Sequence, residues 1–311
     1  MKHRQSQPRR PRRPHAAAVI AAGLCALAIL ATPAAAAHPG SGIVVDANGE
    51  IYFTDTGMGV WKLDRAGKLT LIPASLFHWM ILDAAGSFAG SGKQFGEWFE
   101  RVTPQNIRPA LITCSDFPLT LGADGHIYYA DTRRGFARIV GKSPDGTETV
   151  VAAGPQFREI AGITAGPDGS LYVADVSRAD ASIIRRIGAD GSVSAVATIF
   201  AGRDSLGSPP PETAAAYCRG LAVDSGGVVY VAATGTRSVI RIRPDGNIST
   251  VSRSEGRWSP TGVALFHGEV YVLEWRDAPA SQTEVRKAWA PRIRRIGRDG
   301  SVTTLAAVAR E

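Results

Sequence analysis

Short apolar runs alternate with polar turns along nearly the whole chain after residue 40, and one arrangement returns several times. Each copy has an apolar segment such as GIVVD or GLAVD, a glycine-containing turn, and a tyrosine three residues after the glycine. Runs rich in Val, Ile, Tyr and Thr, separated by Asp-Gly or Gly-Gly, predict antiparallel strands joined by tight hairpins. The anchor glycines of the clearest copies are Gly49, Gly125, Gly169, Gly227 and Gly268.

The spacing of these glycines predicts six copies. The first gap, from Gly49 to Gly125, is about twice the usual spacing, and a degenerate copy, ILDAAGSFAG, lies midway. Its glycine is Gly86, and Ala89 stands at its tyrosine position. Six copies after residue 37 come to about 46 residues each, a length typical of a four-stranded propeller blade. We therefore expect an all-β fold, a six-bladed β-propeller of four-stranded antiparallel blades.

Each copy divides into four predicted strands. An apolar inner strand is followed by the tyrosine-bearing strand, by a third strand such as SVIRIR, and, after a second glycine turn, by a polar outer strand such as NISTV. We expect the tyrosine to pack between blades and the acid three residues later to bind backbone in the following turn. The predicted blades cover about residues 42–75, 78–115, 118–153, 160–200, 219–253 and 261–308, within a single domain, 38–311.

The N-terminal segment has the layout of a secretory signal peptide. Six basic residues precede the apolar run AAAVIAAGLCALAILA, and small residues follow it at Ala35 and Ala37. We expect residues 1–37 to be a signal peptide, removed near Ala37, and the protein to be secreted or periplasmic and off the membrane after cleavage. An uncleaved membrane anchor is the alternative, because the run approaches spanning length.

The charge of the chain bears on its binding partners, and its cysteines bear on disulfide formation. The formal net charge is +7, but the six N-terminal basic residues supply most of it, so the body is nearly neutral and nucleic acid is not an expected partner. Cys114 and Cys218 remain after the signal peptide, and export would permit them to pair. They lie in different copies, so two separate thiols are the alternative to a disulfide. We expect a monomer.

The stretch LAVDSGGVVYVAATGTRSVIRIRPDG and its relatives resemble the NHL-repeat and gluconolactonase-like (senescence-marker-protein-like) six-bladed β-propellers. The resemblance covers nearly all of residues 42–308. It implies the fold predicted above. It also implies a site for a divalent metal, usually calcium. Lactonase-like members hold this metal through a Glu ahead of the first inner strand and through Asn and Asp residues at the entrances of other inner strands.

The matching metal ligands are missing from this chain. Gly40 and Ser41 stand where that Glu would be, and none of the three asparagines, Asn48, Asn106 and Asn247, falls at the start of an inner strand. The histidines able to reach the same end, His38 and His78, are too few for a zinc site. We therefore predict no metal and no cofactor.

The turns of an antiparallel blade divide between two faces, and this division predicts the functional face. The short glycine turns fall on one face, and the long insertions and the links between blades fall on the other, where binding groups are expected. Residues just before or near the inner strands and in the second strand of the last blade should surround the central opening there. The predicted ligand-binding residues are His78, Trp79, Asp116, Arg158, Arg219, Trp258 and Trp275.

Two function classes remain open from the sequence. The first is a binding module that takes a small-molecule or protein ligand on the insertion-bearing face. The alternative is a metal-independent hydrolase or lyase, lactonase-like or strictosidine-synthase-like, that uses a carboxylate at the central opening. Glu159 and Glu274 are the candidate general bases, provided that Trp258 or Trp275 lies close enough to raise a carboxyl pKa.

Overall fold

A computed structural model describes residues 40–75, 77–88, 99–102, 110–114, 117–132, 136–178, 181–200, 217–276 and 290–309. All of them belong to one compact unit, Ala36–Glu311. Within these ranges, no helix has the length and apolar character needed to cross a lipid bilayer.

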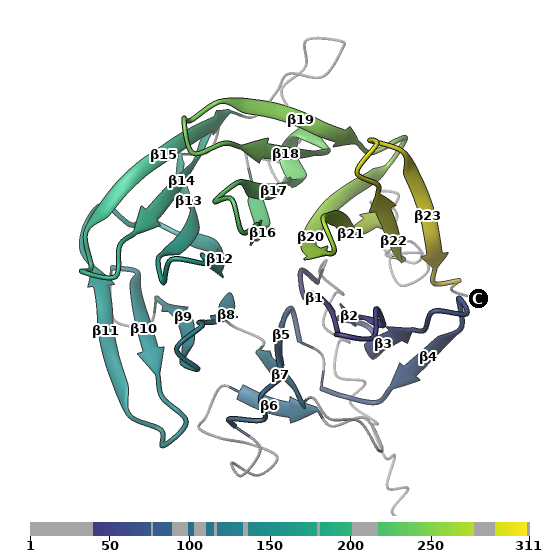
Figure 1. Cartoon of the computed structure of the whole chain (residues 1–311), viewed down its shortest axis with the longest axis horizontal. Helices are drawn as coiled ribbons and strands as arrows, with labels where there is room; N and C mark the ends of the chain where they lie inside the picture. Colours follow the sequence, from purple (N-terminus) through teal and green to yellow (C-terminus); the bar gives the residue numbers. More distant parts are fainter. Residues whose placement is uncertain are drawn as a thin grey trace, which may run out of the picture. The chain divides into compact units, whose positions relative to one another are not determined.

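The described strands form six antiparallel sheets, which we number as blades 1 to 6 in chain order. Figure 1 shows the sheets around a ring, and the inner strands β1, β5, β8, β12, β16 and β20 contact one another in that order, with β20 against β1. The protein is therefore an all-β, six-bladed β-propeller, as predicted.

Each sheet is built from strands that are consecutive in the sequence. Blade 1 contains β1 (Ile43–Val45), β2 (Ile51–Asp55), β3 (Gly59–Leu63) and β4 (Leu69–Ile72). Blade 2 contains β5 (Trp79–Asp83), β6 (Phe99–Val102) and β7 (Ala110–Cys114). Blade 3 contains β8 (Leu119–Leu121), β9 (Ile127–Asp131), β10 (Arg138–Lys142) and β11 (Glu148–Ala153). Blade 4 contains β12 (Ile160–Ala165), β13 (Leu171–Arg178), β14 (Ala181–Ile187) and β15 (Val193–Phe200). Blade 5 contains β16 (Cys218–Val223), β17 (Val229–Ala233), β18 (Ser238–Ile242) and β19 (Ile248–Arg253). Blade 6 contains β20 (Trp258–Phe266), β21 (Glu269–Arg276), β22 (Pro291–Ile296) and β23 (Val302–Ala307). A single-turn 3-10 helix, η2 (Thr234–Thr236), joins β17 to β18.

Blade 2 departs from the predicted strand order. Its described strands lie in the order β5-β7-β6, so the strand next to the inner one is the last of the three in the sequence. All five residues of β7 are buried, and a fully buried strand suits the middle of a blade that is covered on both faces. The degenerate copy after Gly86 has lost its tyrosine, whereas ALITC can fill this central place.

Glycines at the starts of the inner strands let neighbouring blades approach closely. A Cβ added to Gly162 would collide with the backbone oxygen of Arg219 in blade 5, and one added to Gly262 would collide with the backbone oxygen of Ser41 in blade 1. Gly220 meets Gly262 in the same way. The register of β12, β16 and β20 shifts beside these glycines, as in a β-bulge.

The repeated tyrosines pack between blades, as predicted. Tyr172 of blade 4 lies in a core cluster with Leu221 and Val231 of blade 5, and Tyr271 of blade 6 lies in one with Ile43 of blade 1. Each tyrosine therefore fastens its blade to the next, and the last of these contacts closes the ring.

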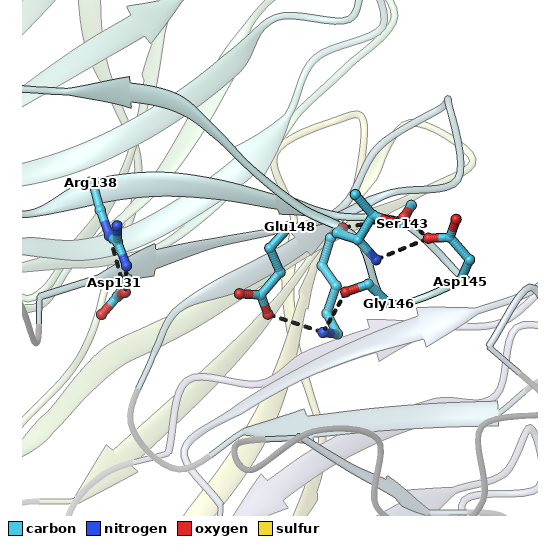
Figure 2. A network of polar contacts seen from close by, with 8 residues as sticks. Asp131, Arg138, Ser143, Asp145, Gly146 and Glu148 are labelled. Carbon is cyan, nitrogen blue, oxygen red and sulfur yellow. Dashed lines mark hydrogen bonds and ion pairs between the residues drawn. The ribbon is translucent and has the colours of Figure 1, made fainter.

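The acid three residues after most of the repeated tyrosines has a wider structural role than predicted, although blade 5 has Ala233 in its place. Asp55 accepts a hydrogen bond of 3.0 Å from the backbone N–H of Gly57 in the following turn, as expected. Asp131 instead forms an ion pair of 2.6 Å with Arg138 of the third strand (Figure 2). Both aspartates are fully buried. A buried carboxylate needs such partners, so this repeated acid is part of the blade's own hydrogen bonding.

Candidate functional site

The inner strands begin at one end of the sheets, which we call the linker face. The links between blades and the connections from second to third strands lie at this face, because adjacent strands are antiparallel. At the opposite end, the turn face, the glycines of the predicted first-to-second and third-to-fourth turns have the positive φ that such hairpins need. The insertions 201–216 and 277–289 lie outside the described residues, but they join strand ends at the linker face.

Three polar side chains meet on the linker face where β12 and β16 begin. The Tyr217 hydroxyl donates a hydrogen bond of 2.7 Å to Glu159 Oε1. The guanidinium carbon of half-buried Arg219 lies 5.6 Å from the centre of the Tyr217 ring, within the range of a cation–π contact. We call Glu159, Tyr217 and Arg219 the blade 4–5 cluster.

The environment of this cluster keeps its phenol protonated. Burial, together with the hydrogen bond to Glu159 and the charge of its carboxylate, raises the pKa of Tyr217 to about 12. Burial also lowers the pKa of the Arg219 guanidinium from its ordinary value, although an arginine with that starting pKa stays charged near neutral pH. The cluster therefore presents a carboxylate acceptor, a phenol and a cation at one place.

A buried aspartate holds the backbone that carries Glu159. Asp175 Oδ1 accepts hydrogen bonds from the backbone N–H groups of Arg158, at 2.9 Å, and Glu159, at 3.2 Å. Its other oxygen accepts one of 2.9 Å from Arg185 Nε. The Arg158 side chain is exposed beside the cluster. Asp175, the repeated acid of blade 4, thus holds the backbone just before β12, and with it the position of Glu159.

A second group lies on blade 6, at the start of β20. The guanidinium carbons of Arg292 and Arg276 lie 4.2 Å and 5.9 Å from the centre of the Trp258 ring. We call these three residues the blade 6 cluster. Trp258 and Arg276 are directly opposite each other in the pairing of β20 with β21. The sheet pairing itself therefore assembles an aromatic ring with two cations.

Glu274, one of the two candidate bases, is bound on both of its oxygens. Oε2 accepts a hydrogen bond of 2.6 Å from Arg292 Nε, and Oε1 accepts bonds from Ser254 Oγ at 2.6 Å and Arg294 Nη1 at 3.2 Å. The residue is 2% exposed. A carboxylate with these partners is suited to stabilising the contact between blades 5 and 6 and is poorly placed to accept a substrate's proton.

Trp275 lies in the core between blades 6 and 1, a position that differs from the predicted binding rim. It is 1% exposed and packs in one cluster with Ile51 and Phe53. Successive side chains of a strand point to opposite faces, so Trp275 faces blade 1 whereas Glu274 faces blade 5. Trp275 is therefore not available to a ligand on the surface, and it does not shield the Glu274 carboxylate.

Two further predicted residues, His78 and Trp79, lie at the start of blade 2. The His78 backbone oxygen accepts hydrogen bonds from the N–H groups of Ser41, at 2.7 Å, and Gly42, at 2.9 Å, which ties blade 2 to blade 1. Trp79 is half-buried against the core of blades 2 and 3. Asp116 lies outside the described residues. The structure thus gathers Arg158, Glu159 and Arg219 near one another, and Trp258 on the adjoining inner strand.

Sequence reasoning did not single out Tyr217, Arg276 or Arg292. Tyr217 belongs to no repeat motif, and its carboxylate partner is in another blade. A signal was present for Arg292, because third strands such as IIRRI and PRIRRI carry arginines opposite or near the repeated acid.

Among the described residues, no group of three or more His, Cys, Asp and Glu side chains is arranged to hold a metal ion. Cys114 and Cys218 are buried thiols that lie in different core clusters. Burial raises the pKa of the Cys218 thiol to about 12. The structure therefore corresponds to two separate thiols, the alternative to a disulfide.

No protein-family model matches the chain, and no curated protein matches its sequence. Solved structures do match. A gluconolactonase from Xanthomonas campestris has a TM-score of 0.52 at 13% identity, with 75% of this chain and 82% of that chain covered. A calcium-binding protein, regucalcin, from Agrobacterium tumefaciens has a TM-score of 0.51 at 14% identity, with 80% and 86% covered. A streptogramin B lyase has a TM-score of 0.50 at 15% identity, with 87% and 84% covered. These likenesses show the six-bladed β-propeller fold that the sequence predicted.

Proposed function

We propose that the protein binds a polar ligand, a small molecule or a segment of a protein, on the linker face of blades 4 to 6. One observation carries this proposal. A carboxylate, a phenol, several guanidinium groups and a partly exposed tryptophan occupy the starts of three successive inner strands on the same face. Tryptophan, tyrosine and arginine are the residues most enriched at binding hot spots.

Binding is favoured over catalysis by the state of the two candidate bases. Glu274 has hydrogen bonds to both oxygens, and Glu159 accepts one from a phenol that stays protonated at neutral pH. The alternative, a metal-independent hydrolase or lyase, has Glu159 in its favour, because this carboxylate is exposed on the face that carries the insertions. In such an enzyme Glu159→Gln would abolish turnover and leave ligand affinity nearly unchanged.

Replacing Trp258 or Arg219 with alanine is expected to weaken ligand binding by about 1 kcal/mol or more, roughly fivefold in Kd. A ligand is first found by a thermal-shift screen with sugars, lactones, peptides and divalent ions, because anything that binds only the folded state raises Tm. Isothermal titration then gives the affinities, and circular dichroism confirms the fold of each variant. The matched control is His126→Ala on the turn face, which should bind like the unchanged protein. Loss of binding in the control alone would reverse the assignment of faces.

We also propose that the protein is exported, with residues 1–37 removed as a signal peptide. The expected result is a mature N-terminus at or near His38 in a secreted or periplasmic fraction, measured by N-terminal sequencing. A membrane-bound product that keeps the apolar run from Ala16 to Ala31 would show that this run is an anchor.

A further inference from the structure

The ring closes where blade 6 meets blade 1, and we call this contact the closing boundary. At every other boundary the chain itself passes from one blade into the next, whereas here the last blade meets the first. Each described blade consists of strands that are consecutive in the sequence, so no described strand is shared between blades 6 and 1 (Figure 1). The closing boundary therefore has no direct covalent link of the kind that keeps other neighbouring blades close together.

Apolar packing and a hydrogen bond hold the closing boundary. Trp275 of blade 6 lies in one core cluster with Ile43 of blade 1. The Thr261 hydroxyl of blade 6 donates a hydrogen bond of 2.6 Å to the backbone oxygen of Gly40 ahead of β1. Since non-covalent contacts of this kind must be made again each time they break, the closing boundary depends on them more than a linked boundary does.

Buried polar atoms without hydrogen-bond partners gather at the same boundary. Trp275 Nε1 and Ser41 Oγ are two of them among the described residues, and the Ser41 backbone oxygen lies against β20. A third, Asp46 Oδ2, belongs to the turn of blade 1 whose Gly49 faces Phe266 of blade 6. Water would satisfy these three atoms if the boundary opened, so they lower the cost of opening it.

We propose that the ring opens at the closing boundary as a separate conformational step, at a lower cost in free energy than the unfolding of the other blades. The apolar cluster around Trp275 keeps the closed ring predominant, while the unpartnered atoms and the missing link make this boundary the first to part. The step separates blade 6 from blade 1 and leaves blades 4 to 6 joined, so it is distinct from ligand binding on the linker face.

A native cysteine supplies the reference for a thiol-labelling test of this opening. Cys218 is 1% exposed and lies in the core between blades 4 and 5, away from the closing boundary. Thr261→Cys and Ser41→Cys place thiols on the blade 6 and blade 1 sides of the boundary, at positions that are 1% and 5% exposed. Each reporter is the single thiol of its protein, with the other cysteines replaced by alanine. A buried thiol reacts with a disulfide reagent only when the structure around it opens, so the labelling rate measures opening.

Both boundary thiols should label at least about tenfold faster than Cys218, at similar rates to each other. Their labelling should also depend less on urea, because partial opening exposes less surface than unfolding does. Adding Ser41→Ala to the Thr261→Cys protein should slow labelling about fivefold, since it removes an unpartnered hydroxyl. Ser254→Ala is the matched control, because that hydroxyl is bound to Glu274 at 2.6 Å and its loss should not slow labelling.

Urea unfolding of each variant corrects the labelling rates for changes in overall stability. The proposal is overturned if the two boundary thiols and Cys218 then label at one rate with one urea dependence. It is also overturned if the Ser41→Cys thiol labels fast and the Thr261→Cys thiol does not, because that result means that only the chain before β1 frays. Equal rates with and without Ser41→Ala would contradict the contribution assigned to the unpartnered atoms.

Discussion

Replacing Gly162 with alanine is expected to lower the free energy of unfolding by about 3 kcal/mol, and Tm by about 6 °C or more. The backbone of Gly162 is outside the left-handed region, so alanine could adopt it without local strain. The added Cβ would instead collide with the backbone oxygen of Arg219 in the next blade. A carbonyl in a bulged strand cannot rotate aside as a side chain can, so the two blades must separate. Urea unfolding of both proteins measures the difference.

Gly226 provides the matched control for this substitution. It lies in the turn between β16 and β17, outside the left-handed region, and a Cβ there would meet only Asp224 Oδ1, at 3.3 Å. Gly226→Ala should therefore change stability by no more than about 1 kcal/mol in either direction. Equal effects of the two substitutions would mean that the close approach of β12 to β16 does not limit how the blades pack.

Features with a local cause could be predicted from the sequence. Gly49, Gly169 and Gly227 each precede a tyrosine by three residues, and all three have the positive φ of the predicted hairpin turns. The tyrosines pack between blades because the repeat places the same side chain at each boundary whose copy keeps the tyrosine. The spacing of the glycines and tyrosines was therefore enough to predict both the number of blades and the division of the turns between two faces.

The candidate site could be predicted only in part, because its contacts join distant segments. Glu159 and Tyr217 meet across a blade boundary, and the ring of inner strands decides which side chains come within reach. Position before an inner strand correctly selected Glu159 and Arg219 as linker-face residues. Placement in the second strand of the last blade, which selected Glu274 and Trp275, could not separate these two residues, since alternation along β21 sends one toward blade 5 and the other toward blade 1.

The second large effect is expected at Glu274. Replacing it with alanine should destabilise the protein by about 3–5 kcal/mol, because the change leaves two guanidinium groups without their counter-charge. Arg294 is only 9% exposed, and it also donates a hydrogen bond of 3.3 Å to the backbone oxygen of Arg253 in blade 5. Its charge would then be buried with a single neutral acceptor. Urea unfolding of the variant and the unchanged protein measures the loss.

Glu269 lies on the same strand and allows a like-for-like control. Its carboxylate is at the turn face, 27% exposed, and 3.8 Å from Arg295. Glu269→Ala should therefore cost no more than about 1 kcal/mol, as for other exposed ion pairs. A loss at Glu274 no larger than at Glu269 would contradict a structural role for Glu274 and would return it to the candidate bases. A large loss confined to Glu274 would leave the exposed carboxylate of Glu159 as the remaining candidate on this face for contact with a ligand.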